Sequence, residues 1–345
     1  METIGINIIV FLFLPYIILQ KCTYLKYGWN ENLLTPDDSA IMRGIAAIFV
    51  VFSHFLTLQG KQVYNLGPAI LFRWTGGLGV CIFFFISGYG LWTKYQDNII
   101  TCHFLWKRFK NIIPTVLVLR FIFAFLLKTY QKGYKYFLLY TLNIEAPLWF
   151  ITEIIIIYIL YYIAAKVGKK HRIFLMTGLL ILMSIIFYLL DMDERWYNAN
   201  LVFTAGMLFA KYRVNFLIFY QKHYWIKLGL NVFLFIICSV GFSLFKGRLL
   251  AISLKLIAGS LFSICLVAVL MKIQVNSRLL LFIGKYSLQI YVIHLSLREL
   301  ISITIGRRSP LLFFSLGFIS TFLLTIIYQY IERKIRNVIS TSFCI

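Results

Sequence analysis

The chain is poor in charged residues, in acidic residues above all, and in proline. Only 13% of its 345 residues are charged, 12 are Asp or Glu, and six are Pro. Soluble domains usually contain about 25% charged residues, so this composition excludes an ordinary soluble domain, and it excludes a disordered chain as well. The chain is rich instead in hydrophobic residues, at 61%, and in aromatic residues, at 18%. This combination is typical of an all-α, polytopic transmembrane helix bundle.

Paired cysteine motifs are also missing. No two of the six cysteines form a CxxC motif, so the sequence predicts neither a zinc site nor a thioredoxin-like redox site, and we expect no metal. The overall composition also argues against a disulfide-stapled secreted domain. The cysteines are Cys22, Cys81, Cys102, Cys238, Cys265 and Cys344.

Positive charge far exceeds negative charge, with 34 Lys and Arg giving a formal net charge of +22. Such an excess is one feature of nucleic-acid-binding proteins. Here the basic residues lie in short loops between apolar runs, without a basic arm or an RNA-binding module. Positive loops that face an anionic cytoplasmic leaflet explain the excess more simply. We therefore expect membrane lipids as partners and no nucleic acid.

Eleven apolar runs are candidates to cross the membrane, because a helix needs about 20 residues to do so. The runs at 198–210 and 4–20 are the shortest. No Lys or Arg precedes the first run and no small-residue cleavage site follows it, so we expect an uncleaved helix there. The runs lie near 4–20, 39–60, 76–93, 111–129, 147–165, 173–190, 198–210, 226–245, 249–271, 279–297 and 310–331.

The loop charges predict the orientation of the bundle. The loops after odd-numbered runs, together with the C-terminal tail, carry more Lys and Arg than the other loops. Basic loops stay on the cytoplasmic side. The sequence therefore predicts a multi-pass protein of the cell membrane, with its N-terminus outside and its C-terminus in the cytoplasm.

Two ionisable residues lie eleven positions apart in the second run. Arg43 and His54 fall within about 20° of the same helix face, with His54 about 16 Å further along the axis. Gly44 and Ala47 beside them are small enough for another helix to approach closely. One interpretation places both side chains at a shared site. In the alternative, Arg43 snorkels to the cytoplasmic surface and His54 is only hydrogen-bonded in the bundle.

Two further runs contain unusual polar residues. Glu153 lies inside the fifth run, where a carboxyl group should be protonated, paired or hydrated; Trp149 precedes it by about 6 Å along the helix and is alternatively an interfacial anchor. In the tenth run, polar or small residues at i, i+3, i+7 and i+10 form a stripe on one helix face, with a structural hydrogen-bond network as the alternative. The stripe consists of Gly284, Ser287, Tyr291 and His294.

Other segments carry weaker signals. The third run contains glycines at 76, 79 and 88 beside Ser87, a pattern that suits close packing or a locally opened backbone. The predicted cytoplasmic loop 94–110 ends in a cluster that includes Arg108 and Lys110. Clustered cations beside a membrane bind phosphates, although they also arise simply as positive-inside residues.

Taken together, these segments resemble the acyltransferase-3 family of integral membrane acyltransferases. The matching pieces occur in the family's order, from the second to the tenth run, so the resemblance covers nearly the whole chain. They are Arg43 followed by His54, Gly79-Val80 with Phe83-Phe84, Ser87-Gly88-Tyr89, Pro114 after a basic loop, Leu148-Trp149-Phe150, and Gly284 with Ser287, Tyr291 and His294.

The resemblance implies one transmembrane acyltransferase domain over residues 1–345. Residues 38–331 form the family core, 1–37 add an extra helix and loop before it, and 332–345 form a cytoplasmic tail. The chain departs from the family in its basic loop, which often carries two arginines three positions apart. Arg108 matches the first, Asn111 occupies the second position, and Lys110 is expected to supply the missing charge.

The resemblance further implies O-acyl transfer, most simply of an acetyl group, from acetyl-CoA as co-substrate to a hydroxyl of a cell-surface carbohydrate or lipid-linked glycan. His54 is the candidate base, because imidazole titrates near about pH 6.5. Arg43 would pair with the anionic part of the donor or orient the site. Arg108 and Lys110 would hold the CoA phosphates.

The other candidate residues are expected to face the substrates. Glu153 would orient a histidine or bind the sugar, and Tyr291 and His294 would contact the acceptor or carry protons. The substrate-binding set is Ser87, Trp149, Glu153, Tyr291 and His294. The expected partners are acyl-CoA, a carbohydrate or glycolipid acceptor and membrane lipids. The sequence specifies neither the acceptor, nor the acyl group, nor the oligomeric state.

Two other functions are consistent with the same residues. A proton-coupled transporter or flippase for an anionic or lipid-linked sugar would use intramembrane Arg, His and Glu as a relay. Broken helices and inverted repeats favour a transporter, and the sequence shows neither, apart from the glycine-rich third run. A structural membrane subunit without chemistry would leave the polar stripes unexplained.

Overall fold

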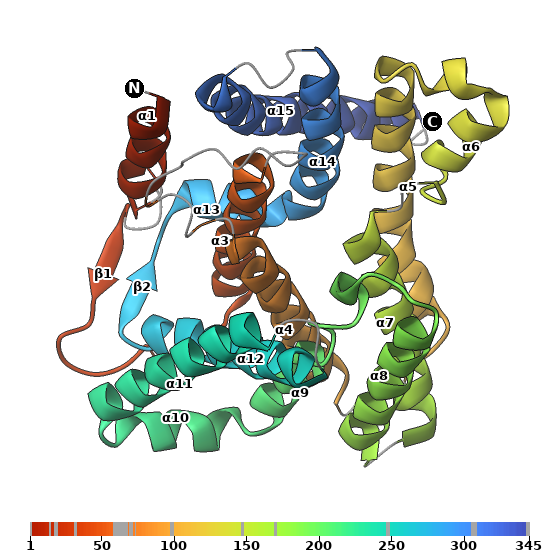
Figure 1. Cartoon of the computed structure of the whole chain (residues 1–345). Helices are drawn as coiled ribbons and strands as arrows, with labels where there is room; N and C mark the ends of the chain where they lie inside the picture. Colours follow the sequence, from red (N-terminus) through yellow and green to blue (C-terminus); the bar gives the residue numbers. More distant parts are fainter. Residues whose placement is uncertain are drawn as a thin grey trace.

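The computed structural model of the chain describes residues 2–13, 15–16, 20–30, 33–57, 68, 72, 74–96, 100–145, 148–168, 171–245, 249–304 and 309–342. Helices account for most of these residues, and strands for very few (Figure 1). Among the described residues, eight helices are long and apolar enough to cross a membrane, or up to ten if each of two bent helix pairs counts as one span. The prediction of an all-α polytopic bundle is confirmed.

The elements follow the chain in the order labelled in Figure 1. They are α1 (Glu2–Ile8), the π-helix η1 (Ile9–Phe13), β1 (Cys22–Tyr24), α3 (Pro36–Leu56), α4 (Thr75–Tyr95), α5 (His103–Leu126), the 3₁₀-helix η3 (Thr129–Lys132), α6 (Tyr134–Thr141), α7 (Trp149–Gly168), α8 (Arg172–Leu189), the 3₁₀-helix η5 (Glu194–Trp196), α9 (Val202–Lys211), α10 (Arg213–Gln221), α11 (Tyr224–Leu244), α12 (Leu249–Leu270), β2 (Ile273–Val275), α13 (Arg278–Lys285), α14 (Ser287–Thr304) and α15 (Pro310–Ser342).

Helix α3 lies at the centre of the bundle and is its most buried span. A capping box starts it: the Thr35 hydroxyl accepts from the Asp38 backbone N–H, and the Asp38 carboxylate accepts from the Thr35 N–H, with Pro36 in the first turn. These groups satisfy backbone donors that a helix start leaves free. The helix packs against α4, α13, α14 and α15, so its residues meet neighbours on nearly every side.

Small residues set the closest helix contacts. A methyl group added at Gly44 would strike the Leu280 carbonyl oxygen of α13, and one added at Gly79 would lie 2.6 Å from the Ala46 carbonyl oxygen. The expectation that Gly44 lets a helix approach is confirmed. The same holds where α4 crosses α9, because a methyl group at Gly88 would overlap the Phe203 backbone.

One expected span, 279–297, is broken rather than continuous, and a second break follows the run at 198–210. Helices α9 and α10 meet at an angle of 82°, and α13 and α14 at 74°. The predicted continuous run at 279–297 is therefore wrong, since Tyr286 separates two differently directed helices. The expectation that the chain contains no broken helices outside the glycine-rich third run is also wrong. The predicted first run, 4–20, lies partly outside the described residues; within it, residues 4–13 and 15–16 are helical.

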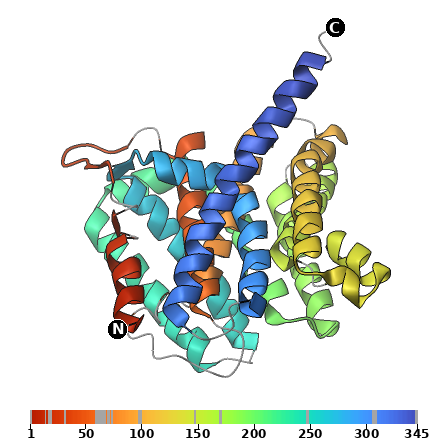
Figure 2. The same cartoon turned by 90° about the horizontal axis from the view of Figure 1, so that it is seen from above.

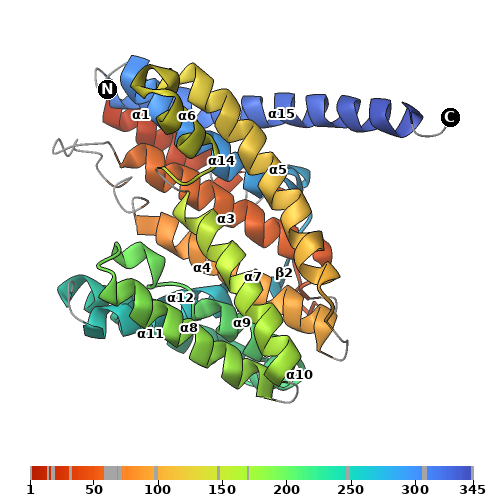
Figure 3. The same ribbon diagram turned by 90° about the vertical axis from the view of Figure 1, so that its right-hand side faces the viewer.

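Helices α5 to α8 form a second layer beside the central helices (Figures 1 and 3). Within this layer α5 contacts α6 and α7, and α7 contacts α8, while α5 also packs against α14. On the other flank, β1 and β2 pair antiparallel, with Cys22 opposite Val275. The C-terminal part of α15 extends away from the other helices (Figure 2).

Side-chain contacts define two ends of the bundle. At one end, the Arg298 guanidinium of α14 donates to the Thr57 carbonyl just after α3, at 2.7 Å. At the other end, the Arg172 guanidinium donates to the Tyr95 carbonyl at the end of α4, at 2.5 Å. We call the first the His54 end and the second the Arg43 end, because His54 lies in the last turn of α3 and Arg43 lies in the N-terminal half of the helix.

Candidate active site

Two histidines from different helices meet at the His54 end. His54 Nδ1 lies 2.7 Å from His294 Nε2, and the two rings are nearly parallel, with an angle of 11° between them and centroids 5.0 Å apart. Residues 54 and 294 are 240 positions apart, so only the packing of α14 against α3 brings them together. His294 is fully buried, whereas His54 is partly exposed.

A main-chain carbonyl determines which nitrogens carry protons in the neutral pair. His294 Nδ1 lies 2.8 Å from the Ile290 carbonyl oxygen. A carbonyl can only accept, so His294 Nδ1 is the donor and its Nε2 is left as an acceptor. His54 Nδ1 must then donate to His294 Nε2. This assignment, made from the hydrogen-bond network, leaves the lone pair of His54 Nε2 free to accept a proton.

Cations surround the histidine pair. Arg298, one turn beyond His294 on α14, and Arg195, in the segment between α8 and α9, both lie within electrostatic range of His54. Arg298 is anchored by its bond to Thr57. Arg195 donates to both carboxylate oxygens of Asp193, each at 2.8 Å, and this bond lowers the pKa of Asp193 below its ordinary value. The site therefore suits the development of negative charge.

The polar stripe of the tenth run is only partly preserved. Ser287, Tyr291 and His294 lie on one face of α14, where they line a gap against Ala47 and Val50 of α3 together with Phe83 of α4. Gly284 does not share this face, because it belongs to α13, where it packs on the Ala40 backbone. The prediction of a continuous four-residue stripe is therefore wrong. The gap itself is too narrow to hold a water molecule.

Glu153 lies at the centre of the bundle without a partner. Its side chain has no solvent exposure, and neither carboxylate oxygen has a hydrogen-bond donor among the described residues. Cys81 and Tyr291 are within electrostatic range, and the Tyr291 hydroxyl is also without a hydrogen-bond partner in the described part of the chain. A carboxyl group in this position has to be neutral or bound to something the chain itself does not supply.

Aromatic rings pack around the start of α7, near Glu153. Phe150 packs on Phe83 and Tyr291, with ring centroids 5.5 and 5.2 Å apart, and Trp149 packs on Phe150 at 6.1 Å. Trp149 is half-buried and so supports the wall through Phe150. Ser87 follows Phe83 by one turn on α4, which places it on the same face, and it is half-buried as well.

Two arginines converge at the Arg43 end. The Arg108 guanidinium of α5 lies 5.6 Å from the centre of the Tyr158 ring on α7 and 5.7 Å from that of Phe104. Arg43 of α3 lies within electrostatic range of the same Tyr158. The buried Arg108 Nε has no hydrogen-bond acceptor among the described residues. Arg43 and Arg108 therefore leave donors available for an anion such as a phosphate.

Lys110 is not part of this cluster. The segment expected to be a loop is helical from His103 onward, and residues two positions apart lie on opposite faces of a helix. Lys110 is accordingly exposed, whereas Arg108 is partly buried against Tyr158. Asn111, at the position of the family's second arginine, is exposed too.

A cavity of about 830 Å³ opens at the His54 end, with a mostly apolar lining that includes four charged side chains. It lies between the start of α4, the segment around η5, and helices α11 and α12. Its charged residues are Asp193, Glu194, Arg195 and Lys255, and its aromatic residues are Trp74, Phe235 and Phe242. We call it the polar cavity.

The polar cavity adjoins the histidine pair across one turn of α4. An added methyl group at Gly76 would lie 2.7 Å from the hydroxyl of Ser53, the residue before His54, whereas one at the next residue, Gly77, would face the Lys255 ammonium at 3.8 Å. Arg195 connects the two regions, since it lines the cavity and acts electrostatically on His54. The cavity and the histidine pair therefore lie on neighbouring parts of the His54 end.

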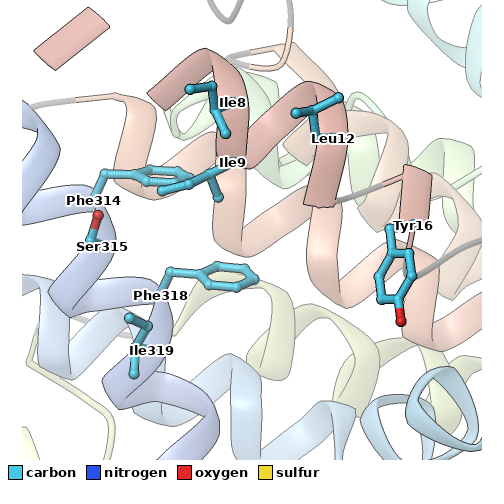
Figure 4. Close-up of a pocket in the computed structure, with 8 residues that line it drawn as sticks. All are labelled: Ile8, Ile9, Leu12, Tyr16, Phe314, Ser315, Phe318 and Ile319. Atoms are coloured by element: carbon cyan, nitrogen blue, oxygen red, sulfur yellow. The ribbon is translucent and has the colours of Figure 1, made fainter. Parts of the chain in front are cut away.

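A second hollow, between the N-terminal helices and α15, has a different character. It has a volume of about 550 Å³, and Figure 4 shows Ile8, Ile9, Leu12 and Tyr16 on one side facing residues 314–319 of α15 on the other. Its described lining contains no His, Cys, Lys, Arg, Asp or Glu. Its lining is almost wholly apolar.

A comparison with protein families identifies the bundle. Residues 39–330 match a family model described as an acyltransferase domain, acyltransferase-3. This match covers well over half of the chain. The protein belongs to the acyltransferase-3 family. It is a multi-pass membrane acyltransferase. Comparisons with curated proteins and with solved structures give no significant match.

Several residues of this membrane acyltransferase escaped the sequence analysis. The sequence singles out none of Arg195, Lys255 and Arg298, although Arg195 and Lys255 line the polar cavity and Arg195 and Arg298 act on His54. Tyr158 gave no signal either, being one aromatic residue in an apolar run. Each of these residues reaches the site only because segments that are distant in the sequence pack against one another. Among the described residues no group of three His, Cys, Asp or Glu could hold a metal ion.

Proposed function

We propose that this acyltransferase moves an acyl group, most simply acetyl, from acetyl-CoA to a hydroxyl of a cell-surface carbohydrate or lipid-linked glycan, with His54 as the base. The observation that carries the proposal is the Ile290–His294–His54 hydrogen-bond chain, which leaves His54 Nε2 as a free proton acceptor. A base held in one tautomer by a second group is a recurrent arrangement in acyl transfer.

The two ends of the bundle suit the two substrates. At the Arg43 end, Arg43 and Arg108 would hold the phosphates of acetyl-CoA, whose pantetheine arm then points along α3 toward His54. The separation of Arg43 and His54, about 16 Å along the helix axis, requires an extended and flexible donor. At the His54 end, the polar cavity would hold the acceptor. On the orientation expected from the loop charges, the donor enters from the cytoplasm.

The chemical step is an exchange of one ester for another. His54 Nε2 takes the proton of the acceptor hydroxyl, and the oxygen attacks the thioester carbonyl carbon. The carbonyl becomes a tetrahedral oxyanion, for which the neighbouring Arg298 and Arg195 provide positive charge. The carbon–sulfur bond then breaks, the CoA thiolate takes the proton from His54, and the oxygen ester remains on the acceptor. Glu153, without a partner in the interior, would contact the passing substrate.

The test compares His54→Ala with the wild type in membranes supplied with radiolabelled acetyl-CoA. Loss of a general base typically lowers the rate about 10² to 10⁴-fold, so we expect label in the glycan fraction to fall by at least that lower factor. The protein has to remain inserted, which its yield and gel-filtration profile report. Normal labelling by correctly folded His54→Ala protein contradicts the assignment.

A proton-coupled transporter or flippase for an anionic or lipid-linked sugar is the second candidate. The breaks between α9 and α10 and between α13 and α14 favour it, because transporters use broken helices at their binding sites. The family match favours the acyltransferase. Purified protein distinguishes the two: only an acyltransferase binds labelled acetyl-CoA and passes the label to an acceptor.

A further inference from the structure

Lys255 is a cation inside a membrane-spanning helix, and the mechanism above does not use it. It lies on α12, in the first third of the helix, and its ammonium faces the polar cavity. The ammonium sits 5.3 Å from the centre of the Phe242 ring. Among the described residues, no hydrogen-bond acceptor and no carboxylate within 4 Å pairs with it, since the ion pair there joins Arg195 and Asp193. A charge so placed is costly unless something balances it.

The acids of the cavity act on the Lys255 ammonium from a distance, and neither forms an ion pair with it. Both carboxylate oxygens of Asp193 accept hydrogen bonds from the Arg195 guanidinium, and one of them also accepts from the Arg195 backbone N–H. Glu194 acts on Lys255 only at longer range. Of the other groups that face the ammonium, Cys81 is a neutral thiol and Arg195 repels it. In the described part of the chain, Lys255 is thus the cavity's unpaired cation.

The cavity has room for much more than a small ion. Its volume of about 830 Å³ falls in the range of about 300 to 1,000 Å³ that holds drug-sized ligands. Trp74, 65% exposed, offers an aromatic face at its border, and Asn198 and Ser239 offer hydrogen bonds. One wall is α11, whose Leu244 lines the cavity and is exposed. These features suit a sugar ring.

We propose that Lys255 binds the anionic group, a phosphate or a carboxylate, of an acidic sugar held in the polar cavity. The sugar ring then lies in the cavity beside Lys255 and the adjoining turn of α4, in which Gly76 packs on Ser53 and Gly77 faces the ammonium. The identification of this sugar as the acyl acceptor rests on the proposed function. The binding of an anionic sugar at Lys255 does not. The anion is either part of a soluble acidic sugar or the phosphate that links a sugar to a lipid.

The experiment measures binding without acetyl-CoA. Purified protein in nanodiscs is titrated with glucose 1-phosphate, glucuronic acid, neutral glucose and farnesyl-phosphate-linked glucose. We expect wild-type protein to bind the anionic probes at least tenfold more tightly than glucose. Lys255→Met should lose at least tenfold in affinity for them, and Lys255→Arg should keep affinity within about threefold, because it retains the charge. Added salt should weaken binding.

The matched control is Lys211→Met, which removes the same charge from an exposed position at the end of α9 and should leave binding unchanged. Tighter binding of the farnesyl probe supports a lipid-linked ligand, and equal binding supports a soluble one. Wild-type protein that binds none of the anionic probes, or Lys255→Met protein that is folded and binds them like the wild type, overturns the proposal.

The outcome separates this inference from the proposed function. If binding depends on Lys255 but no acetyl transfer occurs, the binding site is supported and the acyltransferase mechanism is contradicted. If transfer depends on His54 but binding does not depend on Lys255, the mechanism is supported and the Lys255 site is contradicted.

Discussion

A main-chain carbonyl, rather than an acid, fixes the proton on His294. The Ile290 carbonyl accepts from His294 Nδ1, and the order of donors that follows leaves His54 Nε2 as the free base. Because His294 is fully buried, it would reach substrate less readily than the partly exposed His54. We therefore assign it a positioning role, which differs from the acceptor contact expected from the sequence.

This role predicts that the two histidines act as a unit. His294→Ala should reduce acetyl transfer, because His54 loses the acceptor that sets its tautomer, and the loss should be smaller than that of His54→Ala. The double variant should be no slower than His54→Ala alone, since groups that act together are not additive. The measurement is the rate of label transfer for all four proteins. Additive losses would show that His294 works independently of His54.

At the scale of the elements, close backbone contacts position the site. Helix α4 is held against α3 through Gly79 and against α9 through Gly88 and Gly206. Since α4 carries Phe83 in the interior and Gly77 at the polar cavity, these contacts place both walls. The sequence predicted glycine-rich packing in this run, and it could not predict the partner helices, which are set by tertiary packing alone.

The crossing of α4 and α9 yields a prediction with an internal control. Gly88→Ala should destabilise the protein by about 1 to 3 kcal/mol, the usual cost of overpacking, because its new methyl group overlaps the Phe203 backbone. Gly90→Ala, two residues further along α4, meets nothing within 4 Å. The thermal unfolding midpoint in detergent should fall for the first variant and not for the second. Equal midpoints would contradict the described packing.

The closed gap between α3 and α14 yields a second prediction at this scale. Because it is too narrow for water, a thioester can reach His54 along this route only when the helices separate. Ala47→Leu fills the gap, so it should leave the binding of acetyl-CoA at the Arg43 end within about twofold and reduce acetyl transfer at least tenfold. Gly178→Leu, at an open position on α8, adds similar bulk and should change neither. Transfer at the wild-type rate by Ala47→Leu would exclude this route.

At the scale of the molecule, the sequence predicted the fold class and family from hydrophobic runs and ordered motifs. It failed where geometry depends on long-range contact. The α13–α14 break at Tyr286 left no marker in the apolar pattern, so Gly284 was wrongly grouped with His294. Arg43 and Arg108 were both expected at the donor end and do converge on Tyr158, whereas Lys110 does not, because the helix starts before it.

The whole account depends on donor and acceptor entering from opposite ends of one bundle. Figure 1 shows α14, α5 and α7 on the same side of α3, and Arg43 and His54 face this side toward Tyr158 and His294 respectively. The loop charges predict that the Arg43 end is cytoplasmic. The arginine that holds the donor phosphates would then lie about 16 Å from the catalytic base along the helix, half of the hydrocarbon thickness of about 30 Å.

The most direct measurement supplies radiolabelled acetyl-CoA to one side of sealed vesicles of known orientation, with wild-type or His54→Ala protein. The account predicts labelled glycan on the outer side only when acetyl-CoA is present on the cytoplasmic side, and only with His54 intact. Wild-type labelling when acetyl-CoA is supplied solely from the outer side, or undiminished labelling by His54→Ala, would contradict it.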